Sequence, residues 1–210
     1  MTLSRSIAVV DYGIGNLHSA HKALVYVGAS ATLTDDHEVI RTADAVVLPG
    51  VGSFGACMDA LRERSLDGVV ADAATSGRPF LGICVGMQML FEGSEESPGV
   101  MGLGLIKGSI KWLPESVKRP QMQWNQLTIH RDDPVFDGSQ TESDWMYFVH
   151  SLSAVPADRA MVVATVSYGT DVVAVVRSGS ILATQFHPEK SSHAGLSMLS
   201  RWVTSIGGGR

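Results

Sequence analysis

The residues best suited to chemistry are a cysteine and a histidine near opposite ends of the chain. Cys84 lies in the pattern Gly-x-Cys-x-Gly, between an apolar run at residues 80–83 and a helical pattern. This spacing is typical of a nucleophile elbow, where a strand turns sharply into a helix around the reactive residue. Gly82 and Gly86 satisfy the need for small flanking residues. The free N–H groups of the following helix favour a thiolate over a thiol.

A candidate base and its orienting acid follow the apolar run at residues 181–186. His187 and Glu189 are two residues apart, so on an extended segment their side chains point to the same side. A carboxylate that holds one ring nitrogen leaves the other free to exchange a proton with a thiol. We therefore predict that Cys84, His187 and Glu189 form a catalytic triad. Cys57 is interpreted as a packing residue. The other histidines are interpreted as surface or structural residues, and the role of His150 is the least clearly marked among them. They are His18, His21, His37, His130, His150 and His193.

A glycine-rich loop at residues 49–52 is the candidate oxyanion hole. Attack on an amide carbonyl creates an oxyanion that needs two N–H donors. The amide of Val85, directly after the nucleophile, is one candidate, and the amide of Gly50 or Val51 is the second. Glycines at positions 50 and 52 would let the loop flip between a donor-out and a donor-in state. The other interpretation is an ordinary strand–helix connection.

The sequence predicts that the helices and strands that position these residues form a single α/β domain over residues 1–210. Short β-branched runs alternate with helical patterns in the first half, which is typical of a parallel sheet flanked by helices. We expect its strands at residues 7–10, 31–33, 45–48 and 80–83. Between the first two, Leu17, Ala20, Leu24 and Val27 recur at helical spacing, with Asn16 as the N-cap and Gly28 as the stop.

Beyond about residue 105 the pattern changes to strands separated by turns. Mixed or antiparallel pairing is expected there. A final amphipathic helix has Leu196, Leu199, Val203 and Ile206 near one face, before a glycine tail that we expect to fray. The expected strands of this half cover residues 110–113, 127–129, 145–149, 162–166, 172–176 and 181–186.

Composition excludes several classes of function. The formal net charge of -5 offers no basic field for nucleic acid or an anionic membrane. The apolar start of the chain is interrupted by Asp11, so we expect no export signal and a cytoplasmic protein. No Cys/His cluster has zinc spacing, and the glycines at 13 and 15 lack the lysine of a phosphate loop. We expect neither a metal nor a cofactor.

Five motifs in order resemble the class I, triad-type glutamine amidotransferases, and the resemblance spans nearly the whole chain. Within that family they are most similar to the glutaminase subunits of imidazole glycerol phosphate synthases. The motifs are residues 11–17, 49–55, 82–88, 147–151 and 185–191.

The resemblance implies a glutaminase that hydrolyses glutamine through a cysteine thioester. It further implies that Gln88, Glu96 and the backbone around Ser151 and Leu152 hold the amino and carboxyl groups of glutamine, beside Gly50, Val51, Gly52 and Val85 at the reacting carboxamide. The implied partner is a cyclase of barrel fold in a heterodimer. It would take up ammonia through an internal passage and form imidazole glycerol phosphate and aminoimidazole carboxamide ribotide in histidine biosynthesis, a lyase activity of the complex.

One segment departs from the family pattern. Where the family commonly has Pro-His-x-Gly-Trp-Asn, this chain has Gln121 and Gln123 in place of the histidine and the glycine. The segment is expected near the partner, with Trp124, Asn125 and Tyr147 as interface candidates or, alternatively, as core residues. Three rival interpretations remain: the subunit of another amidotransferase such as anthranilate synthase, a non-catalytic regulator, and a cysteine peptidase.

Overall fold

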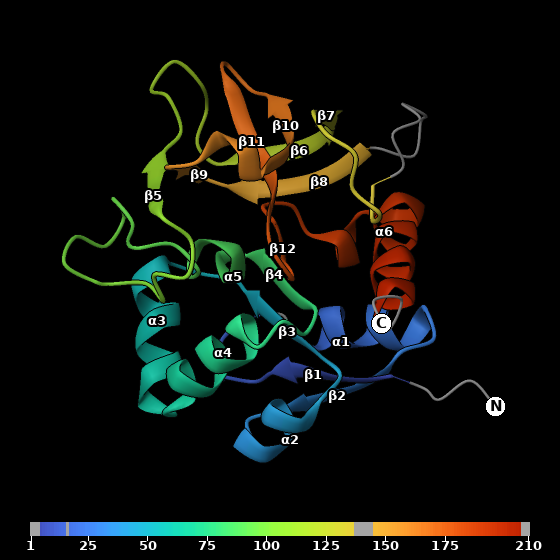
Figure 1. Ribbon diagram of the computed structural model, residues 1–210. Coiled ribbons are helices and arrows are strands. Elements are labelled where there is room, and N and C mark those ends of the chain that lie inside the picture. Colours follow the sequence, from blue (N-terminus) through green and yellow to red (C-terminus); the bar gives the residue numbers. More distant parts are fainter. Residues whose placement is uncertain (1–4, 16, 137–144, 207–210) are drawn as a thin grey trace.

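The computed structural model describes residues 5–15, 17–136 and 145–206. Within these residues the central sheet has eight strands in the order β2-β1-β3-β4-β12-β11-β10-β7 (Figure 1). The strands from β2 to β12 run parallel, and β11, β10 and β7 extend the sheet in antiparallel fashion. The bounds are β1 Ser6–Val10, β2 Ser30–Thr34, β3 Ala45–Gly50, β4 Phe80–Cys84, β7 Thr128–Ile129, β10 Val162–Ser167, β11 Asp171–Ser178 and β12 Ile181–Thr184.

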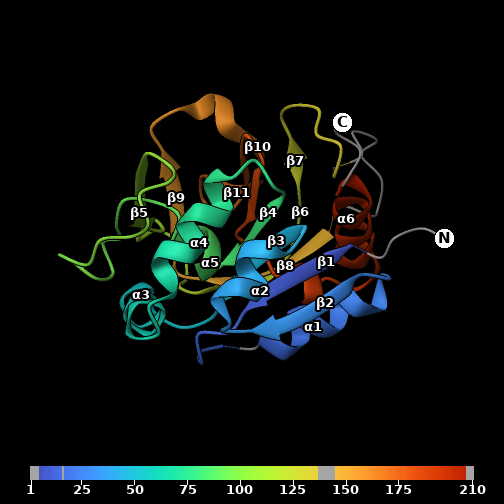
Figure 2. The same cartoon turned by 60° about the horizontal axis from the view of Figure 1, so that its bottom comes forward.

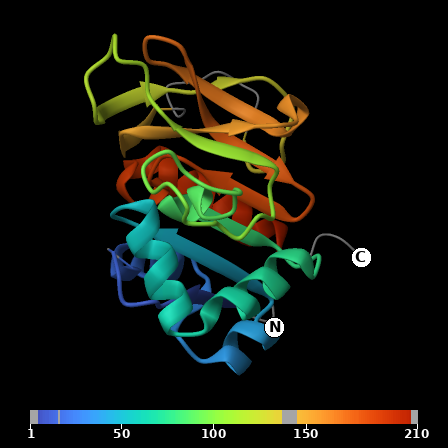
Figure 3. The same cartoon turned by 90° about the vertical axis from the view of Figure 1, so that its left-hand side faces the viewer.

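Helices cover both faces of the parallel part of the sheet (Figures 2 and 3). Helices α2, α3 and α4 pack together on one side, and α1 packs with α6 on the other. Because both faces are covered, β3 and β4 are buried at every position, which explains their continuous apolar runs. The helices are α1 Leu17–Tyr26, α2 His37–Thr42, α3 Phe54–Glu63, α4 Leu66–Thr75, α5 Val85–Gln88 and α6 Ser192–Ser205.

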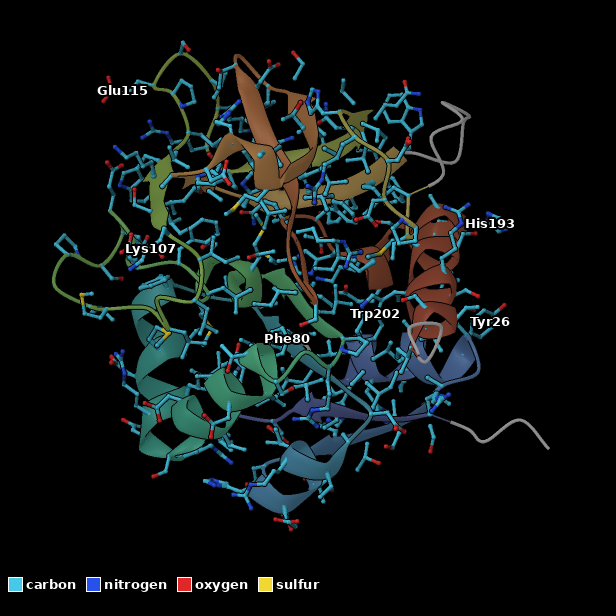
Figure 4. The ribbon with its side chains drawn as sticks, in the orientation of Figure 1. Tyr26, Phe80, Lys107, Glu115, His193 and Trp202 are labelled. Atoms are coloured by element: carbon cyan, nitrogen blue, oxygen red, sulfur yellow. The ribbon has the colours of Figure 1, made fainter. Side chains whose placement is uncertain are left out.

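Two small antiparallel sheets lie above the carboxyl edge of the parallel strands in Figure 1. One pairs β5 (Gly108–Trp112) with β9 (Leu152–Pro156), and the other pairs β6 (Gln121–Gln126) with β8 (Trp145–His150). Figure 4 shows Phe80 and Trp202 inside the molecule and Lys107 and Glu115 near its edge. In the described part of the chain, no helix is long and apolar enough to span a membrane.

The α/β class, the parallel first half and the mixed second half are confirmed. Two strands, β6 and β9, were not expected. The helical pattern after the nucleophile runs through Leu90 and Phe91 in the sequence, but α5 ends at Gln88. Helix α1 ends at Tyr26, and Gly28 has a φ of 93° just beyond it. The expected cap Asn16 and the tail at residues 207–209 lie outside the described residues.

The face of the last helix also differs from the expected one. In α6 the buried side chains are Met198, Leu199 and Trp202, and Ile206 just after the helix is buried as expected, whereas Leu196 and Val203 are only partly buried against the core. The sequence pattern does not place Trp202 on the buried face, but in the structure its side chain is only 1% exposed. The helical period was right, and its buried face is rotated by about one residue.

Candidate active site

Cys84 stands at the turn between β4 and α5. Its φ of 55° and ψ of -111° are rare for a residue with a side chain, and are the strained geometry of an elbow. A Cβ at Gly86 would lie 1.9 Å from the carbonyl oxygen of Leu48, on the neighbouring strand β3. A Cβ at Gly82 would approach the Gly86 oxygen to 3.1 Å. Gly86 is therefore required for the turn to pack against β3, whereas a side chain at Gly82 would crowd the turn itself.

The Gly86→Ala substitution is expected to destabilise the fold by about 3 kcal/mol, because the new methyl group overlaps the backbone of β3. Gly68→Ala is the matched control, since Gly68 lies in α4 with no atom within 4 Å of an added Cβ. That variant should be stabilised by about 0.5 kcal/mol. Urea unfolding of both variants checks this. Equal stability of Gly86→Ala and wild type would show that the elbow tolerates a side chain.

His187 and Glu189 follow β12, which pairs in parallel with β4. The Nδ1 atom of His187 is 2.8 Å from the Oε1 atom of Glu189, and both side chains are almost fully buried. The backbone of His187 is fixed as well, because its N–H donates to the Tyr147 carbonyl and its carbonyl accepts from the Ser191 hydroxyl. The imidazole is thus held in one orientation beside Cys84.

The charge on His187 is set by its two partners. Burial alone lowers the pKa of His187, but side-chain hydrogen bonds with Cys84 and Glu189, together with their negative charges, outweigh burial and raise this pKa to about 10. The ring is therefore protonated at neutral pH when it faces a thiolate. A protonated imidazole next to a sulfur nucleophile has the proton that a departing amine requires.

These groups open into a cavity of about 350 Å³. It lies at the carboxyl edge of β3, β4 and β12, the usual ligand position in an open parallel sheet. Its wall is completed by β8 and by the start of β9. The lining residues are Val51, Gly52, Cys84, Val85, Gln88, Glu96, Pro120, Val149, His150, Ser151, Leu152, His187 and Lys190.

All but one of the expected substrate residues line this cavity. Gly50 does not line it, and instead packs against the elbow, where an added Cβ would lie 2.6 Å from the Gly86 nitrogen. The amide of Gln88 donates to the carbonyl oxygen of Leu152 at 3.4 Å. The carboxylate of Glu96 accepts from the Phe54 N–H at 2.7 Å, at the start of α3. The triad and the glutamine-binding candidates are therefore gathered around one space.

The loop of the candidate oxyanion hole is held by two residues that do not line the cavity, Tyr12 and Cys57. The hydroxyl of Tyr12 donates to the Pro49 carbonyl at 2.7 Å, and the thiol of Cys57 lies 3.6 Å from the Val51 carbonyl. Burial raises the pKa of the Cys57 thiol to about 11, so this cysteine stays neutral. Gly52 has a φ of 119°, which a residue with a side chain rarely adopts.

Sequence reasoning missed Gln185. This buried side chain donates to the Cys84 sulfur at 3.7 Å, and its Oε1 atom accepts from Gln88 at 3.0 Å. It precedes His187 by two residues, the same spacing that relates His187 to Glu189. That alternation was available in the sequence as a signal. Lys190, Pro120 and Val149 also line the cavity and were not predicted as site residues, although each lies in one of the segments that resemble the family.

His150 also lines the cavity, although the sequence marks its role the least clearly among the histidines. Its Nδ1 atom lies 2.7 Å from the Leu152 carbonyl oxygen. The pKa of His150 is lowered to about 4, chiefly by burial; the hydrogen bond to Leu152 opposes this shift, and the charge of nearby His187 adds to it. The ring is therefore neutral near pH 7.

This neutral histidine predicts a loss of stability in acid. The unfolded chain takes up a proton on His150 as the pH falls below 6.5, whereas the folded protein resists until about 4. The free energy of unfolding should therefore fall by about 3 kcal/mol from this group between about pH 7 and pH 4. Urea unfolding of wild type and His150→Asn across this range tests it. Parallel pH dependences for the two proteins would contradict the expectation.

The interface candidates lie on the sheet of β6 and β8. The rings of Trp124 and Tyr147 are 5.8 Å apart, with Trp124 exposed and Tyr147 partly buried. Asn125 accepts hydrogen bonds from the amides of Gln121 and Gln123. Met122 and Trp145 are exposed on the same two strands. Met122, Trp124 and Trp145 share one face of this sheet, which is open to solvent and adjoins the cavity at Val149, whereas Asn125 is on the other face.

Comparison with known proteins decides the family. The model for glutamine amidotransferase class-I matches residues 8–205. The chain belongs to the class-I glutamine amidotransferase family. Two curated relatives are named imidazole glycerol phosphate synthase subunit HisH. The protein from Methanothermobacter thermautotrophicus is 46% identical, covering 95% of this chain and 98% of its own, and that from Methylococcus capsulatus is 48% identical, covering 94% and 95%.

Solved structures share the fold of this chain. The PurLQS structure from Thermotoga maritima has a TM-score of 0.74 at 24% identity, and covers 97% of this chain and 98% of that one. At this identity the likeness supports the fold alone. The triad geometry and the relatives together favour an amidotransferase over the peptidase and the regulator considered above.

Proposed function

We propose that this chain is the glutaminase subunit of imidazole glycerol phosphate synthase in histidine biosynthesis. The observation that carries the proposal is one cavity containing Cys84 in elbow geometry, with His187 held by Glu189. The names of relatives at 46% and 48% identity support the imidazole synthase over anthranilate synthase. Both cysteines are free, which fits the reducing cytoplasm.

In the first half of the reaction, the Cys84 thiolate attacks the side-chain carbonyl carbon of glutamine. A carbon–sulfur bond forms while the carbonyl electrons move to the oxygen. The N–H of Val85 and one N–H of the loop at residues 50–52 stabilise this oxyanion. His187 then gives its proton to the nitrogen, the carbon–nitrogen bond breaks, and ammonia leaves. Cys84 retains a γ-glutamyl thioester.

In the second half, His187 removes a proton from a water molecule, which attacks the thioester carbon. The carbon–sulfur bond breaks, glutamate leaves, and the thiolate and the imidazolium are restored. Glu189 remains a carboxylate and keeps the ring aligned, in the role of the acid of a triad. Gln88, Glu96, Ser151 and Leu152 would hold the amino and carboxyl groups of the substrate.

The released ammonia is useful only if an acceptor is near, because ammonia loses its nucleophilicity once it is protonated in bulk water. A cyclase subunit of barrel fold is the proposed acceptor, in a heterodimer. The exposed Met122, Trp124 and Trp145 support docking on the β6–β8 face, since aromatic residues and methionine are enriched at protein interfaces. Asn125 and Tyr147 belong to the same strands.

The proposal is tested by purifying the chain alone and together with the cyclase subunit. Glutamate formation is measured for each, with and without the ribonucleotide substrate of the cyclase. We expect low activity for the isolated chain and a large increase in the complex with ribonucleotide. Full activity of the chain alone, or stimulation by an anthranilate synthase partner instead, would contradict the assignment.

A further inference from the structure

Two buried hydrogen-bond acceptors face each other across β6 and β8. His150 and Gln121 are directly opposite in this antiparallel pair, so their side chains lie on the same face. They are 6% and 0% exposed. Within the described residues, neither the Nε2 atom of His150 nor the Oε1 atom of Gln121 has a hydrogen-bond partner.

Both atoms are acceptors, as their neighbours show. The Leu152 carbonyl can only accept, so the proton of neutral His150 is on Nδ1, and Nε2 carries a lone pair. The amide nitrogen of Gln121 donates to Asn125 at 3.0 Å, which fixes its oxygen as the free end. Buried acceptors that lose their hydrogen bonds cost about 1–3 kcal/mol each. The pair therefore calls for a small molecule with at least two N–H or O–H donors.

His150 of this pair lines the catalytic cavity, and Gln121 stands opposite it on the neighbouring strand. His150 and Pro120, the residue before Gln121, both line the cavity that contains Cys84. The facing Cβ atoms of an antiparallel pair are roughly 5 Å apart, so a single small molecule can reach both acceptors. The small molecule with several N–H donors that this cavity would release is ammonia.

We propose that His150 Nε2 and Gln121 Oε1 together accept the ammonia that leaves Cys84-bound glutamine, and direct it into the wall beneath the β6–β8 face. A neutral imidazole with its only proton engaged, and a carboxamide oxygen, have no acidic proton to give, so ammonia held there stays nucleophilic. This inference rests on the proposed glutaminase and synthase activities.

The change from the common family sequence has a structural role in this site. Gln121 stands where the family commonly has histidine, and its amide is anchored through Asn125, which in turn donates to the Ser167 carbonyl at 3.4 Å. Gln123 donates to the same Asn125 oxygen but is exposed. The anchoring prevents a flip that would turn the Gln121 amide nitrogen towards the ammonia.

The test uses the complex of the full chain with its cyclase, supplied with amide-¹⁵N glutamine and excess unlabelled ammonium chloride. Mass spectrometry gives the ¹⁵N fraction of the cyclase product per glutamate formed. The variants are Gln121→Met, which lacks the acceptor, and His150→Asn, which keeps a donor for Leu152 but lacks the distal nitrogen. Gln123→Met is the matched control on the same strand.

We expect the ¹⁵N fraction of the product per glutamate to fall about fivefold in Gln121→Met and in His150→Asn, because each variant loses about one net hydrogen bond to ammonia. In Gln123→Met the ratio should stay at the wild-type value. Because only molecules that turn over are counted, partial unfolding does not change the ratio. Wild-type ratios in both test variants, or an equal fall in Gln123→Met, would overturn the inference. A wild-type complex that transfers no label would instead refute the proposed function.

Discussion

Replacing Cys84 with alanine is expected to lower glutamate formation from glutamine by about 10⁵-fold, because no other group in the cavity can form the thioester. Within the complex, added ammonium salt should still support synthesis by the cyclase, since that step requires only ammonia. Glutamate release and cyclase product are measured on the same preparation. The Cys84→Ala complex should therefore lose glutamate formation but keep synthesis from ammonium salt.

The second cysteine provides the control for this substitution. Cys57 is fully buried in α3, and its pKa is raised to about 11. Cys57→Ala should retain glutaminase activity within about tenfold, since the thiol makes weak contacts only with the Val51 carbonyl and the Tyr12 hydroxyl. If Cys84→Ala also abolished synthesis from ammonium salt, the division of labour between the subunits would be wrong.

Replacing His187 with glutamine should reduce glutamate formation by about 10³-fold, because both the acid that protonates the leaving ammonia and the base that activates water are lost. Cys84 would also lose the positive charge that faces it. The buried Glu189 carboxylate would lose its charged partner, so the variant should also be less stable. Steady-state glutaminase kinetics and urea unfolding measure the two effects.

Glu189→Gln is the companion variant for this prediction. It keeps the size of the side chain but removes the charge that contributes to the raised pKa of His187. Its activity should fall between those of wild type and His187→Gln. Near wild-type activity in His187→Gln would mean that another group exchanges the proton, and the assignment of the base would fail.

The parts of the site that were predictable from sequence are those with strict local requirements. The elbow needs glycine at two flanking positions, and the collision of a Gly86 Cβ with Leu48 shows why. The pairing of His187 with Glu189 follows from the two-residue alternation of an extended chain. Continuous apolar runs identified β3 and β4 because both faces of these strands are buried.

The parts that sequence reasoning missed depend on contacts between distant segments. Strand β6 contains Gln121, Gln123 and Asn125, polar residues with low β-propensity, and is held by its pairing with β8. The place of Gln185 beside Cys84 requires β12 to be next to β4, although their residues are about a hundred positions apart. The burial of Trp202 likewise depends on how α6 packs in the folded chain, where this helix contacts α1.

The central claim is that Cys84 is the sulfur activated by His187. The most direct measurement is labelling with an electrophilic glutamine analogue, followed by mass spectrometry of the two cysteine-containing peptides. We expect a single adduct on Cys84, its loss in His187→Gln, and none on the buried Cys57. Labelling of Cys57, or equally fast labelling of Cys84 without His187, would contradict the claim.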